Sequence, residues 1–146
     1  MQDVIKRVIV INASKQRIYE AIANPDQVVL WFPKTVEGNY SVGERPILGF
    51  GDHGRNQIYI VDARPYDYFA YRWVPGSNHF IGDVLSVTNT LVEFHIEEGT
   101  NGLCKVTMTE SGFAKLSEEM ANDCFNQNSK GWDFMLGRLE KYIAGE

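Results

Sequence analysis

Two charged side chains in the strand-rich part of the sequence could do acid–base chemistry or anchor a ligand. Arg72 lies inside an aromatic strand, and Glu110 shares the alternation of Val106 and Met108, so its side chain is expected to point inward. A buried carboxylate acquires a raised pKa or a paired cation, and either property suits acid–base catalysis or ligand anchoring. The simpler interpretation, which we favour, is a structural ion pair or an exposed strand end.

Other sequence signatures of catalysis and metal binding are absent. There is no Gly-x-Ser-x-Gly nucleophile motif. The three histidines, His53, His79 and His95, are widely separated in the sequence, whereas a zinc site needs three or four converging ligands. Cys104 and Cys124 form no Cys-x-x-Cys pair, so we expect two reduced thiols used as small hydrophobic side chains. We therefore predict no catalytic residue, no metal and no cofactor.

The clearest structural signal is an amphipathic helix near the end of the sequence, from Gly131 to Ile143. Its apolar residues are Trp132, Met135, Leu136, Leu139 and Ile143, at the spacing of one helical face. A single long helix with a broad apolar face needs a partner surface, and most of the preceding sequence has the composition of strands. We therefore expect a curved sheet to cover this helix.

The elements expected before that helix alternate strands with turns and include two short helices. The first are a strand from Val4 to Ile11, a helix over residues 15–23 with Ser14 as its N-cap, and a second short helix capped by Asp26 and ending before Pro33. A strand-and-turn stretch from Lys34 to Trp73 follows, which includes a hairpin of Arg55–Ala63 with Tyr68–Val74, and then a long irregular loop from Pro75 to Val87. The last are strands from Thr90 to Glu97 and from Cys104 to Thr109, and a polar stretch over residues 114–130 with weak helical spacing. This order predicts an α+β fold of about six or seven antiparallel strands around the C-terminal helix.

Length and composition limit the classes of function. The 146 residues fit a single domain, residues 1–146, with 44% hydrophobic and 23% charged residues. A net charge of −5 argues against nucleic acid as a partner, because a phosphate backbone needs a clustered basic face. No segment has the ~18 consecutive apolar residues of a membrane span. The first residues do not resemble a signal peptide, so we expect a cytoplasmic protein.

Several short motifs, in this order and spacing, are similar to those of a known family. They are the helix Ile18-Tyr19-Glu20-Ala21-Ile22, then Asn24-Pro25-Asp26, Trp31-Phe32, Arg64-Pro65, Tyr71-Arg72-Trp73, the strand from Thr90 to Phe94, the stretch from Val106 to Phe113, and the helix from Gly131 to Ile143. Together they resemble the START-like, or SRPBCC (polyketide cyclase/Bet v 1-like), superfamily with its helix-grip fold. Within it, the sequence is most similar to the branch called activator of heat shock protein 90 ATPase homologue-like.

The resemblance implies a cavity between the sheet and the C-terminal helix. The residues expected to bind a ligand there are Trp31, Phe50, Tyr59, Arg72, Trp73, Phe80, Phe94, Met108, Glu110, Trp132, Met135 and Leu136. The alternative for each apolar member is ordinary core packing, since aromatic residues at strand and helix spacing usually belong to a core.

Three hypotheses about function follow. The leading one is a binding protein for a hydrophobic or amphipathic small molecule, with Glu110, Arg72 or Tyr59 supplying specificity and the loop from Pro75 to Val87, with the two short helices, acting as a lid. The second, implied by the family name, is a chaperone-linked or stress-linked protein-interaction domain. The third is a cyclase- or hydrolase-like enzyme that uses the same cavity and needs two titratable groups within hydrogen-bond reach.

Overall fold

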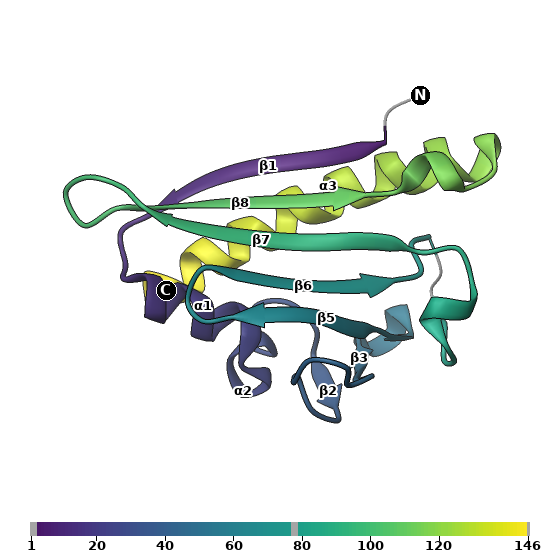
Figure 1. Ribbon diagram of the computed structural model, residues 1–146, viewed down its shortest axis with the longest axis horizontal. Coiled ribbons are helices and arrows are strands. Elements are labelled where there is room, and N and C mark those ends of the chain that lie inside the picture. Colours follow the sequence, from purple (N-terminus) through teal and green to yellow (C-terminus); the bar gives the residue numbers. More distant parts are fainter. Residues whose placement is uncertain (1–2, 77–78, 146) are drawn as a thin grey trace.

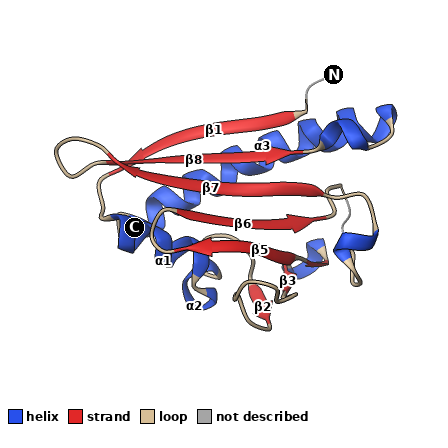
Figure 2. Ribbon diagram, in the orientation of Figure 1, coloured by secondary structure: helices blue, strands red, loops and turns tan. Residues whose placement is uncertain are grey.

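The computed structural model describes residues 3–76 and 79–145, and it has a large antiparallel sheet with a long helix across one face (Figure 1). The large sheet has five strands in the order β1-β8-β7-β6-β5, and a smaller sheet has three in the order β2-β3-β4. Figure 2 shows that the helices lie behind and below the large sheet, while the small sheet lies beyond β5. The predicted α+β helix-grip fold is confirmed, with its strands divided between two sheets.

The elements follow one another in this order: β1 (Val4–Ile11), α1 (Lys15–Ala23), α2 (Pro25–Val28), β2 (Thr35–Glu37), β3 (Ile47–Gly49), η1 (Gly51–His53), β4 (Arg55–Gln57), β5 (Tyr59–Arg64), β6 (Tyr68–Trp73), η2 (Val84–Ser86), β7 (Thr90–Glu98), β8 (Cys104–Ser111), η3 (Phe113–Lys115) and α3 (Glu118–Ile143).

Strands β7 and β8 form the centre of the large sheet and carry the strictest alternation of buried and solvated residues. Val92 and Phe94 of β7 point inward opposite Glu110 and Met108 of β8 in the antiparallel register. His95 lies on the other face of β7 and is exposed, as the alternation predicts. Inward side chains from these strands form the floor on which α3 packs.

The two short helices begin and end at side-chain caps. Ser14 accepts a hydrogen bond from the Arg17 amide at 3.1 Å, which confirms the predicted start of α1. The second helix is shorter than predicted and its cap differs. Asn24, not Asp26, accepts from the backbone, at 2.9 Å, and α2 ends at Val28. Pro25 suits the first helical position, because its missing N–H has no partner there in any helix.

The long helix α3 begins at Glu118, well before the predicted start at Gly131. Ser117 caps it by accepting from the Met120 amide at 3.4 Å. Figure 1 shows these first turns of α3 extending past the end of β8. Because they have little sheet to cover, only Ala121 and Cys124 are buried there, so the apolar stripe by which a helix is recognised is weak.

Candidate functional site

A buried carboxylate joins the sheet to the long helix. Glu110, at the end of β8, has 0% of its surface exposed. Its oxygens accept hydrogen bonds from the indole N–H of Trp73 at 2.8 Å, the Thr90 hydroxyl at 2.6 Å and the indole N–H of Trp132 at 2.8 Å. The Asn128 amide donates to both oxygens, at 3.0 and 3.1 Å. Side chains from β6, β7 and α3 therefore converge on one acceptor.

The partners of Glu110 suit an ionised carboxylate. Indole N–H groups can only donate, and an ionised carboxylate can only accept. Within residues 3–76 and 79–145, no ion pair includes Glu110. The interpretation that we favoured from the sequence, an ion pair or an exposed strand end, is therefore wrong for Glu110. The expected inward orientation of this side chain is confirmed.

The charge of Glu110 acts on neighbouring titratable groups. Burial raises the pKa of the Cys124 thiol, and the negative charge of Glu110 raises it further. Burial also raises the pKa of Tyr71 well above its ordinary value, with smaller contributions from Tyr40 and Glu110. Cys104 and Cys124 are both buried free thiols, as predicted.

Above this carboxylate, aromatic rings from β6, α3 and two connecting segments pack against one another. The Phe32 ring stacks on Trp132 with centroids 5.5 Å apart, and it meets Phe50 edge-on at 5.5 Å. Trp73 lies 6.0 Å from Phe32 and 5.9 Å from Trp132. The indole N–H groups of Trp73 and Trp132 both point to Glu110. The two indoles therefore present only their apolar faces and edges to the groove between α3 and the small sheet.

These rings line a pocket of about 180 Å³, which we call the inner pocket. Its lining residues are Phe32, Phe50, Asn56, Trp73, Gln127, Asn128, Gly131, Trp132 and Met135. A wider hollow of about 420 Å³, the outer groove, adjoins it and shares Phe32, Phe50 and Met135. The outer groove is also lined by Lys34, His53, Phe134 and Arg138. Together they form a continuous, mostly apolar depression between α3, η1 and β4.

The structure brings part of the predicted residue set together at this depression. Phe50, Trp73, Trp132 and Met135 line the inner pocket, and Glu110 lies beneath its floor. Others are core residues, buried under the sheet or between helices: Trp31, Phe94, Met108 and Leu136.

Three predicted residues lie elsewhere. Tyr59 and Arg72 are register partners in β5 and β6, on the face of the sheet opposite to inward-pointing Trp73. Arg72 donates to the Asn89 side chain at 3.0 Å and does not reach Glu110. Phe80 lies beside β4, where its N–H and C=O bond to Arg55 and Gln57.

Several lining residues were missed by sequence reasoning. Asn128 lies four residues before Trp132, and Cys124 four before that, so all three share one helical face. This signal could have been found had the helix been predicted to start earlier. Phe32 was considered only as part of the Trp31-Phe32 motif. Gln127 and Asn56 carry no sequence signal of their own.

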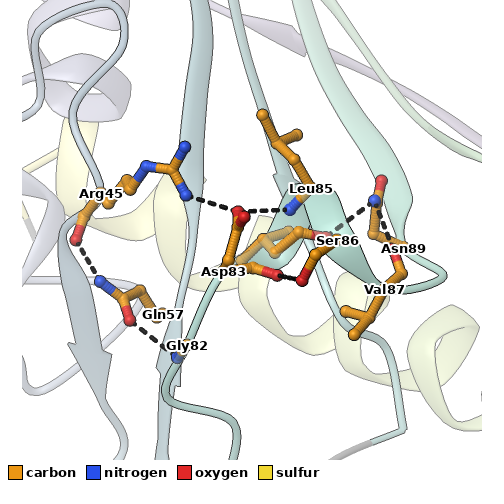
Figure 3. A network of polar contacts seen from close by, with 9 residues as sticks. Arg45, Gln57, Gly82, Asp83, Leu85, Ser86, Val87 and Asn89 are labelled. Carbon is orange, nitrogen blue, oxygen red and sulfur yellow. Dashed lines mark hydrogen bonds and ion pairs between the residues drawn. The ribbon is translucent and has the colours of Figure 1, made fainter.

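Part of the segment expected to form a lid is tied by hydrogen bonds and an ion pair to β4 and to the residues before β3 (Figure 3). Residues 77 and 78 of that loop lie outside the described residues. Beyond them, the Gly82 amide donates to the Gln57 side chain at 2.9 Å, and Arg45 bonds Asp83 at 2.6 Å. Arg45 lowers the pKa of Asp83, whose side chain also accepts from the Leu85 amide at 3.1 Å.

A larger hollow, about 720 Å³, has a different character. It lies along the outer face of β6 and β7 and is lined mainly by charged and polar side chains, of which Lys15 and Asp67 form an ion pair. Over the described ranges, no group of His, Cys, Asp or Glu could hold a metal ion, and no helix is long and apolar enough to cross a membrane. The aromatic depression is therefore the better candidate for a ligand.

Comparisons with known proteins agree on the family and the fold. The sequence profile described as Activator of Hsp90 ATPase homolog 1-like protein matches residues 12–144. No curated protein matches the chain. Among solved structures, DynU16 of the dynemicin biosynthetic locus superposes with a TM-score of 0.78 at 22% identity, over 99% of this chain and 48% of DynU16. The chain thus spans about half the length of that protein.

Two other solved structures are similar over most of their own length. The Aha1 dimer from Colwellia psychrerythraea has a TM-score of 0.75 at 20% identity, covering 97% of this chain and 96% of that one. CalU16 from Micromonospora echinospora has a TM-score of 0.71 at 18% identity, covering 97% and 74%. At these identities the likeness shows the fold alone.

Proposed function

This chain belongs to the family of Activator of Hsp90 ATPase homolog 1-like proteins, and on that premise we propose that it binds a small apolar or amphipathic molecule in the inner pocket. The observation that carries the proposal is the convergence of Phe32, Phe50, Trp73 and Trp132 around that pocket. An apolar, aromatic lining with a few polar groups is the usual composition of a small-molecule site. Here Asn56 and Gln127 would supply polar contacts that orient the ligand.

The size of the pocket limits how the ligand is held. The inner pocket, at about 180 Å³, is smaller than the ~300 Å³ at which typical ligand sites begin. A ligand seated there extends into the outer groove, across the Phe50 and Met135 side chains that both hollows share. The Met135 thioether can adjust to ligands of different shape.

The proposal can be tested by filling the pocket from the helix. Gly131 lines the inner pocket, and a Cβ at this position would meet nothing within 4 Å. We expect Gly131→Leu to place a side chain where the ligand lies and to abolish binding of a neutral probe such as naphthylacetamide. Gly137→Leu is the matched control, because Gly137 is also in α3 with open space around its Cβ but does not line the pocket.

Binding can be followed by the indole N–H signals in NMR. The chain has three tryptophans. Trp73 and Trp132 line the pocket, whereas Trp31 is buried in the core with its N–H donated to the Ala21 carbonyl at 2.7 Å. We expect the probe to shift the Trp73 and Trp132 signals and to leave the Trp31 signal in place. The proposal fails if no indole signal moves, or if Gly131→Leu binds the probe as well as Gly137→Leu does.

The two other hypotheses have separate tests. Stimulation of a chaperone ATPase is suggested by the family's description, and it predicts faster ATP hydrolysis by the cognate chaperone when micromolar amounts of this protein are added. The enzyme hypothesis required two titratable groups in hydrogen-bond reach. In the part of the chain that the structure describes, the inner pocket is lined by none, and Glu110 is covered by its donors. We therefore propose no reaction.

A further inference from the structure

The charge distribution around the depression identifies the kind of molecule that would fit it. We propose that the ligand is an amphipathic anion, an aryl or alkyl carboxylate whose apolar body enters the inner pocket and whose head group is bound in the outer groove by Lys34 and Arg138. This inference rests on the proposed function and adds to it the class and the orientation of the ligand.

The outer groove is basic in a chain whose net charge is −5. Its lining includes Lys34, His53 and Arg138 and no acidic residue. Arg138 is unusual among the arginines: across the described residues it is the only one whose side chain makes no hydrogen bond, ion pair or ring contact, whereas the other arginines bond to acidic, amide or carbonyl partners. Lys34 likewise has no acidic partner there. Two cations thus face one hollow without a counter-charge.

Local backbone structure holds Lys34 at the groove. Its amide donates to the Gly49 carbonyl at 2.7 Å, which fixes the chain beside β3. Its side chain then lies over Gly51, where a Cβ would come within 3.1 Å of the Lys34 Cδ and 3.0 Å of its Nζ. Gly51 also has φ +64°, a conformation that other residues rarely adopt. The glycine therefore leaves the space through which Lys34 reaches the groove.

The floor of the groove suits the apolar body of such a ligand. Phe32, Phe50 and Met135 continue from the inner pocket into the groove without a polar break. Phe134, beside Arg138, is 65% exposed, and among the described rings it contacts no other aromatic ring. A ligand lying across this floor would cover apolar surface that is now in water.

Opposite charges at the inner and outer ends of the depression set the orientation of the ligand. Glu110 lies beneath the inner pocket and carries its negative charge where water does not screen it. A carboxylate that entered first would be repelled by Glu110, whereas one that stays outside meets Lys34 and the guanidinium of Arg138. That planar group can bind a carboxylate through two parallel hydrogen bonds. The apolar end therefore points inward and the anionic end outward.

Three probes that share one ring test this inference: naphthylacetate is anionic, naphthylacetamide neutral and naphthylethylamine cationic. By titration calorimetry in low salt, we expect naphthylacetate to bind about tenfold tighter than naphthylacetamide, and naphthylethylamine to bind most weakly. The preference for the anion should shrink as salt rises, because exposed charges are screened.

Charge-removing variants locate the head group. Lys34→Gln and Arg138→Gln should each lower the ratio of the two affinities, acetate over acetamide, by about two- to fivefold. The matched control is Lys6→Gln: Lys6 is exposed on β1, lines neither hollow, and its side chain makes no hydrogen bond or ion pair in the described chain, so this ratio should stay as in the unmodified protein.

The outcomes separate this inference from the function on which it rests. The inference is overturned, while the inner pocket still binds the probes, if naphthylacetate and naphthylacetamide bind with equal affinity. It is also overturned if Lys34→Gln and Arg138→Gln change the ratio of the two affinities no more than Lys6→Gln does. Failure of all three probes to bind overturns both proposals. A dimer in sedimentation that Phe134→Ser dissociates would show that a second copy covers the groove, which also overturns the inference.

Discussion

Replacing Glu110 by glutamine tests whether the buried carboxylate stabilises the fold. The change keeps the shape of the side chain but converts one acceptor oxygen into an NH₂ donor. One oxygen of Glu110 now accepts from Trp132 and the other from Trp73. In either orientation of the amide, one indole N–H therefore faces another donor. Asn128 and Thr90 can reorient to accept, but an indole cannot.

The expected cost follows from the lost acceptor. A buried donor left without a partner costs about 1–3 kcal/mol, and hydrogen bonds to a neutral acceptor are weaker than those to a charged one. We expect Glu110→Gln to lower the free energy of unfolding by about 2–4 kcal/mol. Urea denaturation followed by circular dichroism measures this value through the shift of the midpoint.

A neighbouring glutamate supplies the control. Glu93 lies on the outer face of β7, is partly exposed, and accepts from the Tyr68 hydroxyl at 2.6 Å. A glutamine at position 93 can still accept that bond, so Glu93→Gln should cost less than about 1 kcal/mol. Combining Glu110→Gln with Trp132→Phe should recover part of the lost unfolding free energy, because the indole N–H of Trp132 that would face the new amide is then absent. If Glu110→Gln costs no more than Glu93→Gln, the buried carboxylate does not stabilise the fold through its indole donors.

Other side chains give sharper yes-or-no results. Tyr71 has a buried hydroxyl without a partner in the described chain, so Tyr71→Phe should raise the free energy of unfolding by up to about 1 kcal/mol in urea titrations. Burial raises the pKa of Tyr71 in the folded state, so the hydroxyl keeps its proton there at pH values where the unfolded chain loses it. The stability that depends on this protonated hydroxyl is full below pH ~10 and is lost progressively above it. The Tyr71→Phe variant should therefore lose less stability in alkali than the unmodified protein. A Cβ at Gly76, where φ is +73°, would collide with the Cys124 sulfur, so Gly76→Ala should cost about 1–3 kcal/mol in thermal melts, whereas Gly137→Ala should add about 0.5–1 kcal/mol. Burial raises the pKa of both Cys104 and Cys124, so a thiol reagent at pH 8 should modify them only after denaturant is added.

Elements that bury a regular face could be predicted from the sequence. The second half of α3, with Trp132, Leu136 and Leu139 at helical spacing, and the alternating strand β7 both appear where expected. The start of α3 could not be placed, because its first turns bury too few side chains to produce a stripe. The small sheet was equally hard to predict: its strands are three residues each, too short for an alternation to be recognised.

The candidate site was predictable where side-chain direction follows from alternation. Glu110 was expected to point inward from its parity in β8, and it does. Which groups would meet it was not predictable, since Trp73, Thr90 and Asn128 come from three different elements and local sequence does not encode tertiary contacts. Tyr59 was expected in the cavity, but β5 is interrupted by a register shift between Ile60 and Asp62, and sequence alternation does not reveal a bulge.

The division into two sheets has a consequence for motion. One wall of the depression, η1 with its flanking strands β3 and β4, belongs to the small sheet, which has its own hydrogen-bonded ladder of short strands. Local opening of so few hydrogen bonds costs less than unfolding the long ladder between β7 and β8. Amide protons of β2, β3 and β4 should therefore exchange with solvent while those of β8 remain protected. A molecule bound against this wall would add its binding free energy to that opening step, so exchange would slow in the small sheet first.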